Sequence, residues 1–289
     1  MNNANQYCQN KVAASGSSFY YSFLFLPAEQ RAAITAIYAF CREVDDIVDE
    51  CQDKAIAQQK LVWWSTEIDR VYTGTPQHPV GIALAQIVKK YKLQKLWFDE
   101  IMQGMAMDLK YQGYQIFDDL KLYCHCVASA VGMLAAAIFG YKNQQTLEYA
   151  KKLGIAFQII NIIRDVGEDA RRGRVYIPEE ELQVFGIKPQ EILELNISNP
   201  ERFTALLAKL AVLARSYYTS ALDTLPAEDR AAQRGGLIMA EIYFKILAEI
   251  EHSNFDVLNQ KISITPLRKL WVAWNTWRLE KKLCLQASS

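Results

Sequence analysis

The stretch AIYAFCREVDDIVDE, residues 36–50, combines helical periodicity with a run of acids. Apolar and aromatic residues here and just before it recur every three or four positions: Ile34, Ile37, Tyr38, Cys41, Val44, Ile47 and Val48. This spacing is typical of a helix and not of a strand. At 100° per residue, one narrow stripe of that helix carries Tyr38, Arg42, Asp45 and Asp49. The stretch therefore predicts an apolar helix with one acidic stripe.

A second stretch, FQIINIIRDVGED at residues 157–169, repeats this arrangement. Its apolar residues keep the helical spacing, and its polar residues share one face: Gln158, Asn161, Asp165 and Asp169. Unit charges about 6 Å apart at an effective dielectric of about 20 repel by about 3 kcal/mol, so each acidic pair should have a cationic partner. An isolated D-x-x-x-D pair is often just a solvated helix face. Two such pairs in apolar surroundings favour a binding site instead.

Carboxylate clusters suit Mg²⁺, which keeps several waters and is usually completed by substrate phosphate oxygens. The basic segment ARRGRVYIP follows the second stripe, and Arg174 and its neighbours could contact phosphate oxygens at the rim. An ordinary solvated helix end is the alternative for this segment.

The rest of the chain favours an all-α fold. No proline lies between Pro27 and Pro76 or between Pro79 and Pro178, so helices have room to run. The segment CVASAVGMLAAAIFG, residues 126–140, is apolar on every side, as in a helix buried within a bundle. We find no linker that would divide residues 1–289, and we predict a single domain.

Composition limits the partners. Thirty-two basic and thirty-two acidic residues give no net field for nucleic acid. The six cysteines include no C-x-x-C pair, which suits a reducing compartment. The first residues lack the apolar core of a signal peptide, and we see no uncharged apolar run of 18 residues. We expect a cytoplasmic protein.

Several blocks together resemble the squalene/phytoene synthase family: SGSSFYYSFLFLP (15–27), AIYAFCREVDDIVDE, YCHCVASAVG (123–132) and QIINIIRDVGEDARRGRVYIP (158–178). The resemblance extends to about Trp277 and so covers nearly the whole chain. It implies a single-domain isoprenoid synthase helical bundle with a central apolar cavity and both aspartate motifs at its mouth. Within the family, the chain is most similar to bacterial presqualene diphosphate synthases of hopanoid and squalene pathways.

The resemblance also assigns roles to residues. It implies a metal site with Asp45, Asp49, Asn161, Asp165 and Asp169. It implies catalytic roles for Tyr38, Arg42, Tyr123 and Arg164. The implied substrate-binding residues are Ser17, Phe19, Phe23, Tyr38, Arg42, Tyr123, Gln158, Asn161, Arg164, Arg174, Tyr243 and Lys261. Relatives carry an arginine where this chain has Lys261, which keeps the charge but loses the bidentate fork.

The implied reaction joins two farnesyl diphosphates head to head, giving presqualene diphosphate and free diphosphate. The implied cofactor is Mg²⁺, for which Mn²⁺ can substitute, and NADPH is not expected. Dehydrosqualene, hydroxysqualene, squalene and phytoene synthases of the same family remain alternatives. The proton-abstracting base is open between a tyrosine such as Tyr123 and the released diphosphate, because a neutral phenol is a poor base.

Two terminal segments suggest further roles. Phe23 falls where a bulky aromatic would limit one tail pocket to farnesyl length, with core packing as the alternative. Near the C-terminus, LRKLWVAWNTWRLEKKL (267–283) mixes tryptophans with lysines and arginines, which suits a peripheral anchor at the inner membrane face. A bundle helix that packs its tryptophans is the alternative. The oligomeric state stays open.

Overall fold

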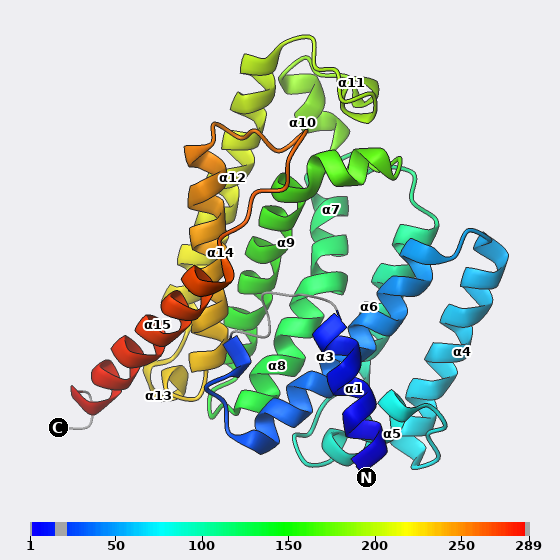
Figure 1. The fold of residues 1–289 in the computed structure, drawn as a ribbon, viewed down its shortest axis with the longest axis vertical. Coiled ribbons are helices and arrows are strands. Elements are labelled where there is room, and N and C mark those ends of the chain that lie inside the picture. The colour runs from blue at the N-terminus through cyan, green and yellow to red at the C-terminus, as the bar shows by residue number, and fades with distance from the viewer. Residues whose placement is uncertain (1, 15–21, 287–289) are drawn as a thin grey trace.

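The computed structural model describes residues 2–14 and 22–286, and within these ranges the regular secondary structure is helical, with no strand (Figure 1). This confirms the predicted all-α class. The elements are α1 (Asn2–Ala14), α3 (Ala28–Glu50), α4 (Lys54–Thr73), α5 (Pro79–Val88), α6 (Lys95–Leu109), α7 (Phe117–Cys124), the π-helix η1 (His125–Ser129), α8 (Ala130–Phe139), α9 (Gln145–Arg171), α10 (Glu179–Val184), α11 (Pro189–Leu193), α12 (Pro200–Thr224), α13 (Ala227–Arg230), α14 (Arg234–His252) and α15 (Pro266–Gln286).

Local sequence fixes several helix ends. The Asp53 side chain accepts hydrogen bonds from the backbone N–H groups of Ala55 and Ile56 and so caps the start of α4. The same helix ends at Gly74, whose φ of +87° is a left-handed conformation that glycine adopts without strain. Asn199 caps α12 in the same way, and Pro200 occupies its first turn.

The longest helix, α9, runs through the middle of the bundle, between α12 on one side and α8 with η1 on the other (Figure 1). Gly154 permits this close packing, because a Cβ there would lie 2.6 Å from the backbone of Ser129. Helices α3, α6, α8, α9 and α14 surround a common interior space. The fold thus brings the two acidic stripes, on α3 and α9, to one cavity.

The apolar segment 126–140 forms most of η1 and α8 and is largely buried, as predicted. Within the described part of the chain, Phe117–Phe139 is long and apolar enough to cross a membrane by length and composition, although no such run was expected. Of its most apolar window, 61% is buried inside the protein. Contacts of this segment with α6 and α9 make it an interior element of the bundle.

Candidate active site

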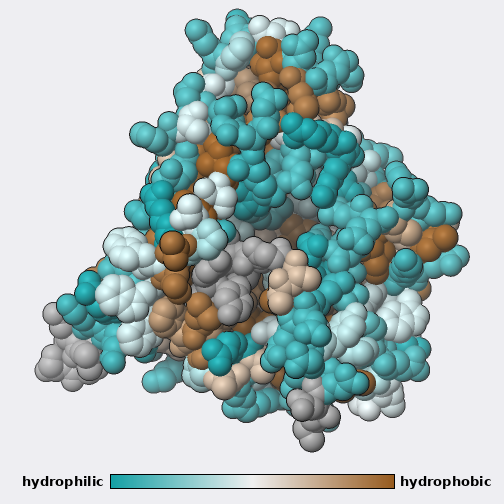
Figure 2. Space-filling model, in the orientation of Figure 1, coloured by the Kyte–Doolittle hydropathy of each residue, from teal (hydrophilic) through white to brown (hydrophobic). Residues whose placement is uncertain are grey.

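A cavity of about 770 Å³ lies between α3, α6, η1, α8, α9 and α14. Figure 2 shows this face of the molecule hollowed near its centre, with hydrophilic side chains around the hollow. The cavity is polar at one end, where both acidic stripes lie, and apolar elsewhere. The described residues of the predicted site that line it are Phe23, Tyr38, Arg42, Asp45, Asp49, Tyr123, Gln158, Asn161, Arg164, Asp165, Asp169, Arg174, Tyr243 and Lys261. Ser17 and Phe19, also predicted, lie outside the described residues.

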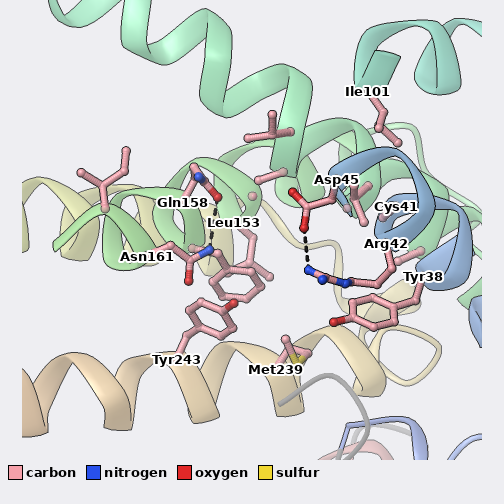
Figure 3. Close-up of a pocket in the computed structure, with 18 of the residues that line it drawn as sticks. Tyr38, Cys41, Arg42, Asp45, Ile101, Leu153, Gln158, Asn161, Met239 and Tyr243 are labelled. Carbon is pink, nitrogen blue, oxygen red and sulfur yellow. Dashed lines mark hydrogen bonds and ion pairs between the residues drawn. The ribbon is translucent and has the colours of Figure 1, made fainter. Parts of the chain in front are cut away.

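The α3 stripe presents its polar groups to the cavity as predicted. Tyr38, Arg42 and Asp45 point across it toward Asn161 and Tyr243 (Figure 3). The Arg42 guanidinium donates to Asp45 Oδ2 at 2.5 Å and also pairs with Asp46. Arg42 therefore supplies the cationic partner that the acidic pair requires.

The α9 stripe is neutralised in a similar way. Arg164 donates through Nε and Nη2 to the two oxygens of Asp165, at 2.8 and 2.5 Å. Lys261 Nζ lies 3.3 Å from Asp165 and 2.8 Å from Glu168. The Lys261 ammonium therefore joins the second motif.

Gly167 determines how the segment that carries Lys261 reaches α9. A Cβ at Gly167 would lie 2.1 Å from the carbonyl oxygen of Leu258. Arg171 also donates to the carbonyls of Gly167 and Leu258, at 2.9 and 3.1 Å. The glycine of the D-V-G-E-D sequence is thus required for close packing of the Lys261 segment on α9.

Two arginines after α9 connect the stripes across the cavity. Arg172 Nη1 lies 2.7 Å from Asp49 Oδ2, and Arg174 Nη1 lies 3.1 Å from Asp49 Oδ1. Asp49 belongs to α3, so these pairs join residues more than 120 positions apart in sequence. The predicted basic rim is therefore in place, and two of its arginines pair with Asp49.

Six acidic and six basic side chains line the cavity, but burial and charge do not act equally on each acid. Burial and the neighbouring Asp49 raise the pKa of Asp45 to about 6. Burial, Asp165 and Glu168 raise the pKa of Asp169 to about 7. In contrast, the pKa of Asp165 is lowered, because the Arg164 and Lys261 interactions outweigh its burial. At Asp45 and Asp169, burial and the neighbouring acids thus outweigh the nearby arginines.

These donors fit a hard cation that shares its coordination with a ligand. Within the described ranges, no three His, Cys, Asp or Glu side chains converge into a closed metal cage. The carboxylates instead face a common space from two helices, and the buried Oδ1 of Asn161 has no hydrogen-bond partner. An open set of oxygen donors suits Mg²⁺, which retains waters and binds substrate phosphates.

A tyrosine network lies beside the acids and was not predicted. The buried Asp108, from α6, accepts a hydrogen bond of 2.8 Å from the hydroxyl of Tyr123 and another of 2.8 Å from that of Tyr176. The rings of the two tyrosines stack with centroids 5.3 Å apart. Burial and the nearby Asp108 raise the pKa of Tyr123 well above its usual value, so the phenol is neutral.

The apolar part of the cavity has aromatic and small residues in its wall. Phe23, Phe139 and Tyr149 line it together with Gly235 and Gly236. Phe23 is 6% exposed. This burial fits both a residue that limits the length of the substrate tail and an ordinary packing residue. Its proposed effect on chain length stays a prediction.

Asp108, Tyr176 and Lys269 also line the cavity and were not predicted as site residues. Asp108 has no acidic neighbour at helical spacing, and Tyr176 follows a break in the helical pattern. Lys269 was grouped with the lysines around the C-terminal tryptophans, although the residue is only 9% exposed and lines the cavity from the inner side of α15. Spacing along the sequence gave no signal for these contacts between distant helices.

The chain is similar to known proteins of one family. The family model for squalene/phytoene synthase matches residues 12–268. The chain is 32% identical over 276 residues to the phytoene synthase of Arthrospira platensis, covering 91% of this chain and 89% of that protein. It is 34% identical over 286 residues to the 15-cis-phytoene synthase of Synechocystis sp., covering 94% and 84%.

Solved structures share the fold. A dehydrosqualene synthase crystallised with ligand has a TM-score of 0.86 and 26% identity, covering 97% of this chain and 98% of that one. A squalene synthase from Alicyclobacillus acidocaldarius has a TM-score of 0.77 at 24% identity, covering 88% and 95%, which is a likeness of fold alone. The family predicted from the sequence is confirmed: the chain belongs to the squalene/phytoene synthase family of prenyltransferase-type enzymes.

Proposed function

We propose that this protein joins two isoprenoid diphosphates head to head and releases diphosphate. One observation carries the proposal: two carboxylate stripes from different helices meet at the polar end of an otherwise apolar cavity. A prenyl diphosphate has the same division, with an anionic head and a hydrocarbon tail. The acids and arginines suit the head, and the apolar wall suits the tails.

The chain's own charges suggest how the head is bound. Mg²⁺ held by Asp45, Asp49, Asp165 and Asp169 would stabilise the charge that develops on the departing diphosphate. Arg42 and Arg164 now neutralise carboxylates of the two stripes. Their guanidinium groups can exchange carboxylate oxygens for phosphate oxygens when the substrate enters. Mn²⁺ can substitute in this role.

The tyrosine network bears on the proton that must be lost. The Tyr123 hydroxyl donates a hydrogen bond to Asp108, so its oxygen keeps its lone pairs for an electron-poor centre in the cavity. A neutral phenol with a raised pKa favours this electrostatic role over proton abstraction. The released diphosphate is then the stronger candidate for the base.

The relatives bear on the product. Those with 32–34% identity are named phytoene synthases, which favours the phytoene synthase alternative over presqualene diphosphate as the end product. Use of the shorter farnesyl substrate is the second candidate. Phe23 in the cavity wall supports it, as does the likeness to a dehydrosqualene synthase. Both candidates share the head-to-head condensation.

Incubation of the purified protein with each substrate separately tests these proposals. Geranylgeranyl diphosphate and farnesyl diphosphate are supplied with Mg²⁺, with and without NADPH, and the products are identified by mass spectrometry. A phytoene-type enzyme gives a C40 hydrocarbon without NADPH, whereas presqualene diphosphate from farnesyl diphosphate supports the sequence prediction. If squalene dominates and its formation requires NADPH, neither the C40 hydrocarbon nor presqualene diphosphate is the end product. No coupled product from either substrate refutes the proposed function.

A further inference from the structure

The outer face of α15 carries large apolar side chains that none of the described residues covers. Leu267 is 81% exposed, Trp271 59% and Trp274 44%. These residues recur at three- and four-residue steps and therefore lie on one face of the helix. Leu279 and Leu283 lie on the side of Val272 instead, and they are 47% and 49% exposed where the end of the helix projects from the bundle (Figure 1).

The opposite face of α15 is firmly attached to the protein. Val272 and Ala273 are buried in the core, and Arg230 holds Glu280 through two bonds of 2.8 and 2.7 Å. Trp277 stacks on Phe25 with ring centroids 5.7 Å apart. The helix position is thus fixed by its inner face, and the exposed tryptophans contribute little to folding.

The charged side chains that α15 itself places along this apolar face are basic. Arg278, Lys281 and Lys282 extend it toward the C-terminus, and the Arg278 guanidinium lies 4.9 Å from the ring centroid of Trp274. Glu280, the one acid in residues 266–286, is occupied by Arg230. Aromatic rings bordered by cations suit the boundary between lipid tails and anionic headgroups.

We propose that α15 docks this protein on an anionic lipid surface through Leu267, Trp271 and Trp274, with Arg278, Lys281 and Lys282 on the headgroups. A second copy of the chain fits this face less well. A two-fold contact places the same patch on both sides, and its cations would then face one another without acids. A negatively charged lipid surface satisfies both the apolar and the basic groups.

The docking helix also contributes to the cavity. Lys269, on the inner side of α15, lines the cavity with the acidic motifs. Docking would therefore hold the cavity close to the lipid phase. For an enzyme with prenyl substrates this places the site where such molecules dissolve, a consequence that rests on the proposed function.

Vesicle co-flotation of the full-length protein tests the docking. The probes are phosphatidylcholine vesicles with and without phosphatidylglycerol, and the readout requires no catalysis. We expect binding to the anionic vesicles that weakens with added salt. The double variant W271A/W274A should lose at least about tenfold in partitioning, because the apolar contact is removed. The variant K281Q/K282Q should lose about tenfold on anionic vesicles only.

Matched variants on α4 control for loss of any exposed tryptophan or lysine. Trp63 is 39% exposed, so W63A removes a similar side chain elsewhere, and K54Q/K60Q removes two exposed lysines. Both should bind like the unchanged protein, with unaltered circular dichroism for all variants. Equal binding by W271A/W274A and the unchanged protein overturns the proposal. So does a dimer in solution that W271A/W274A dissociates while vesicles bind neither form. Docking without turnover would refute only the proposed function.

Discussion

Replacing Asp108 with asparagine tests the tyrosine network. Asp108 accepts two phenolic hydrogen bonds of 2.8 Å, whereas an asparagine carboxamide has one acceptor oxygen and an NH₂ group that can only donate. A hydrogen bond to a charged group contributes about 1.5–3 kcal/mol, so the loss of one of the two bonds costs about 1.5–3 kcal/mol. Removing a buried charge recovers part of this, because burial already raises the pKa of Asp108. We expect a net loss of about 1–2 kcal/mol in the free energy of unfolding.

A loss of this size lowers the melting temperature by roughly 2–8 °C in a chain of this length. D108N should also reduce kcat by about 10- to 100-fold with little change in KM, because Tyr123 loses its fixed orientation. Thermal melts and initial rates on the same preparation measure both effects. The double variant D108N/Y176F should lose less than the sum of the single variants.

A buried acid outside the cavity provides the control. Asp229 accepts hydrogen bonds from the backbone of Lys142 and Asn143 and from Thr146, and it does not line the cavity. D229N should lower the melting temperature without lowering kcat at a temperature where it is folded. Unchanged kcat in D108N, or strictly additive effects in the double variant, would refute the positioning role of Asp108.

Three further predictions follow from the cavity. D45N and D165N should each lower product formation by at least about a hundredfold with unchanged helicity. EDTA should abolish activity, and Mg²⁺ should restore it. Full activity in either variant rejects the metal assignment. F23A should raise the ratio of turnover on geranylgeranyl diphosphate to turnover on farnesyl diphosphate. The control F98A changes a buried ring away from the cavity and should only cost about 3–5 kcal/mol of stability. An unaltered ratio in F23A indicates that Phe23 is simply a packing residue. The pKa values of Asp45 and Asp169 are raised to about 6 and about 7 from an ordinary 3.8, so the folded protein binds more protons than the unfolded chain between about pH 4 and 7. The stability of the fold therefore falls as pH rises through that window. The melting temperature of the ligand-free protein should accordingly be higher near pH 5 than near pH 8, with a smaller difference when Mg²⁺ and inorganic pyrophosphate are present; a melting temperature that increases with pH contradicts this.

Helical periodicity predicted the parts of this molecule that depend on local sequence. Tyr38, Arg42, Asp45 and Asp49 fall on one stripe because a helix repeats every 3.6 residues, and they line the cavity together. The second stripe follows the same rule. Periodicity does not specify which helices face each other. That the two stripes lie at the same cavity was predicted from the family resemblance.

What the sequence could not supply depends on contacts between distant segments. The pairing of Asp49 with Arg172 and Arg174 requires α3 to lie beside the end of α9. Asp108 becomes a tyrosine acceptor only because α6 and α7 pack against the segment after α9. Position 167 requires glycine because the carbonyl oxygen of Leu258 lies against it. Leu258 is 91 residues away in the sequence and belongs to none of the motifs described above.

Helix α9 places residues of graded polarity on the cavity wall. Every fourth residue contributes a lining side chain, in the order Tyr149, Leu153, Phe157, Asn161, Asp165 and Asp169. The helix therefore changes along its length from apolar to amide to carboxylate, over a span of about 30 Å. Because each turn contributes separately, substitutions near Tyr149 can alter the hydrocarbon chamber while the acids four turns away keep their places. A single rigid helix would then let descendants of one ancestor diverge in the size of molecule they accept without rebuilding the chemistry.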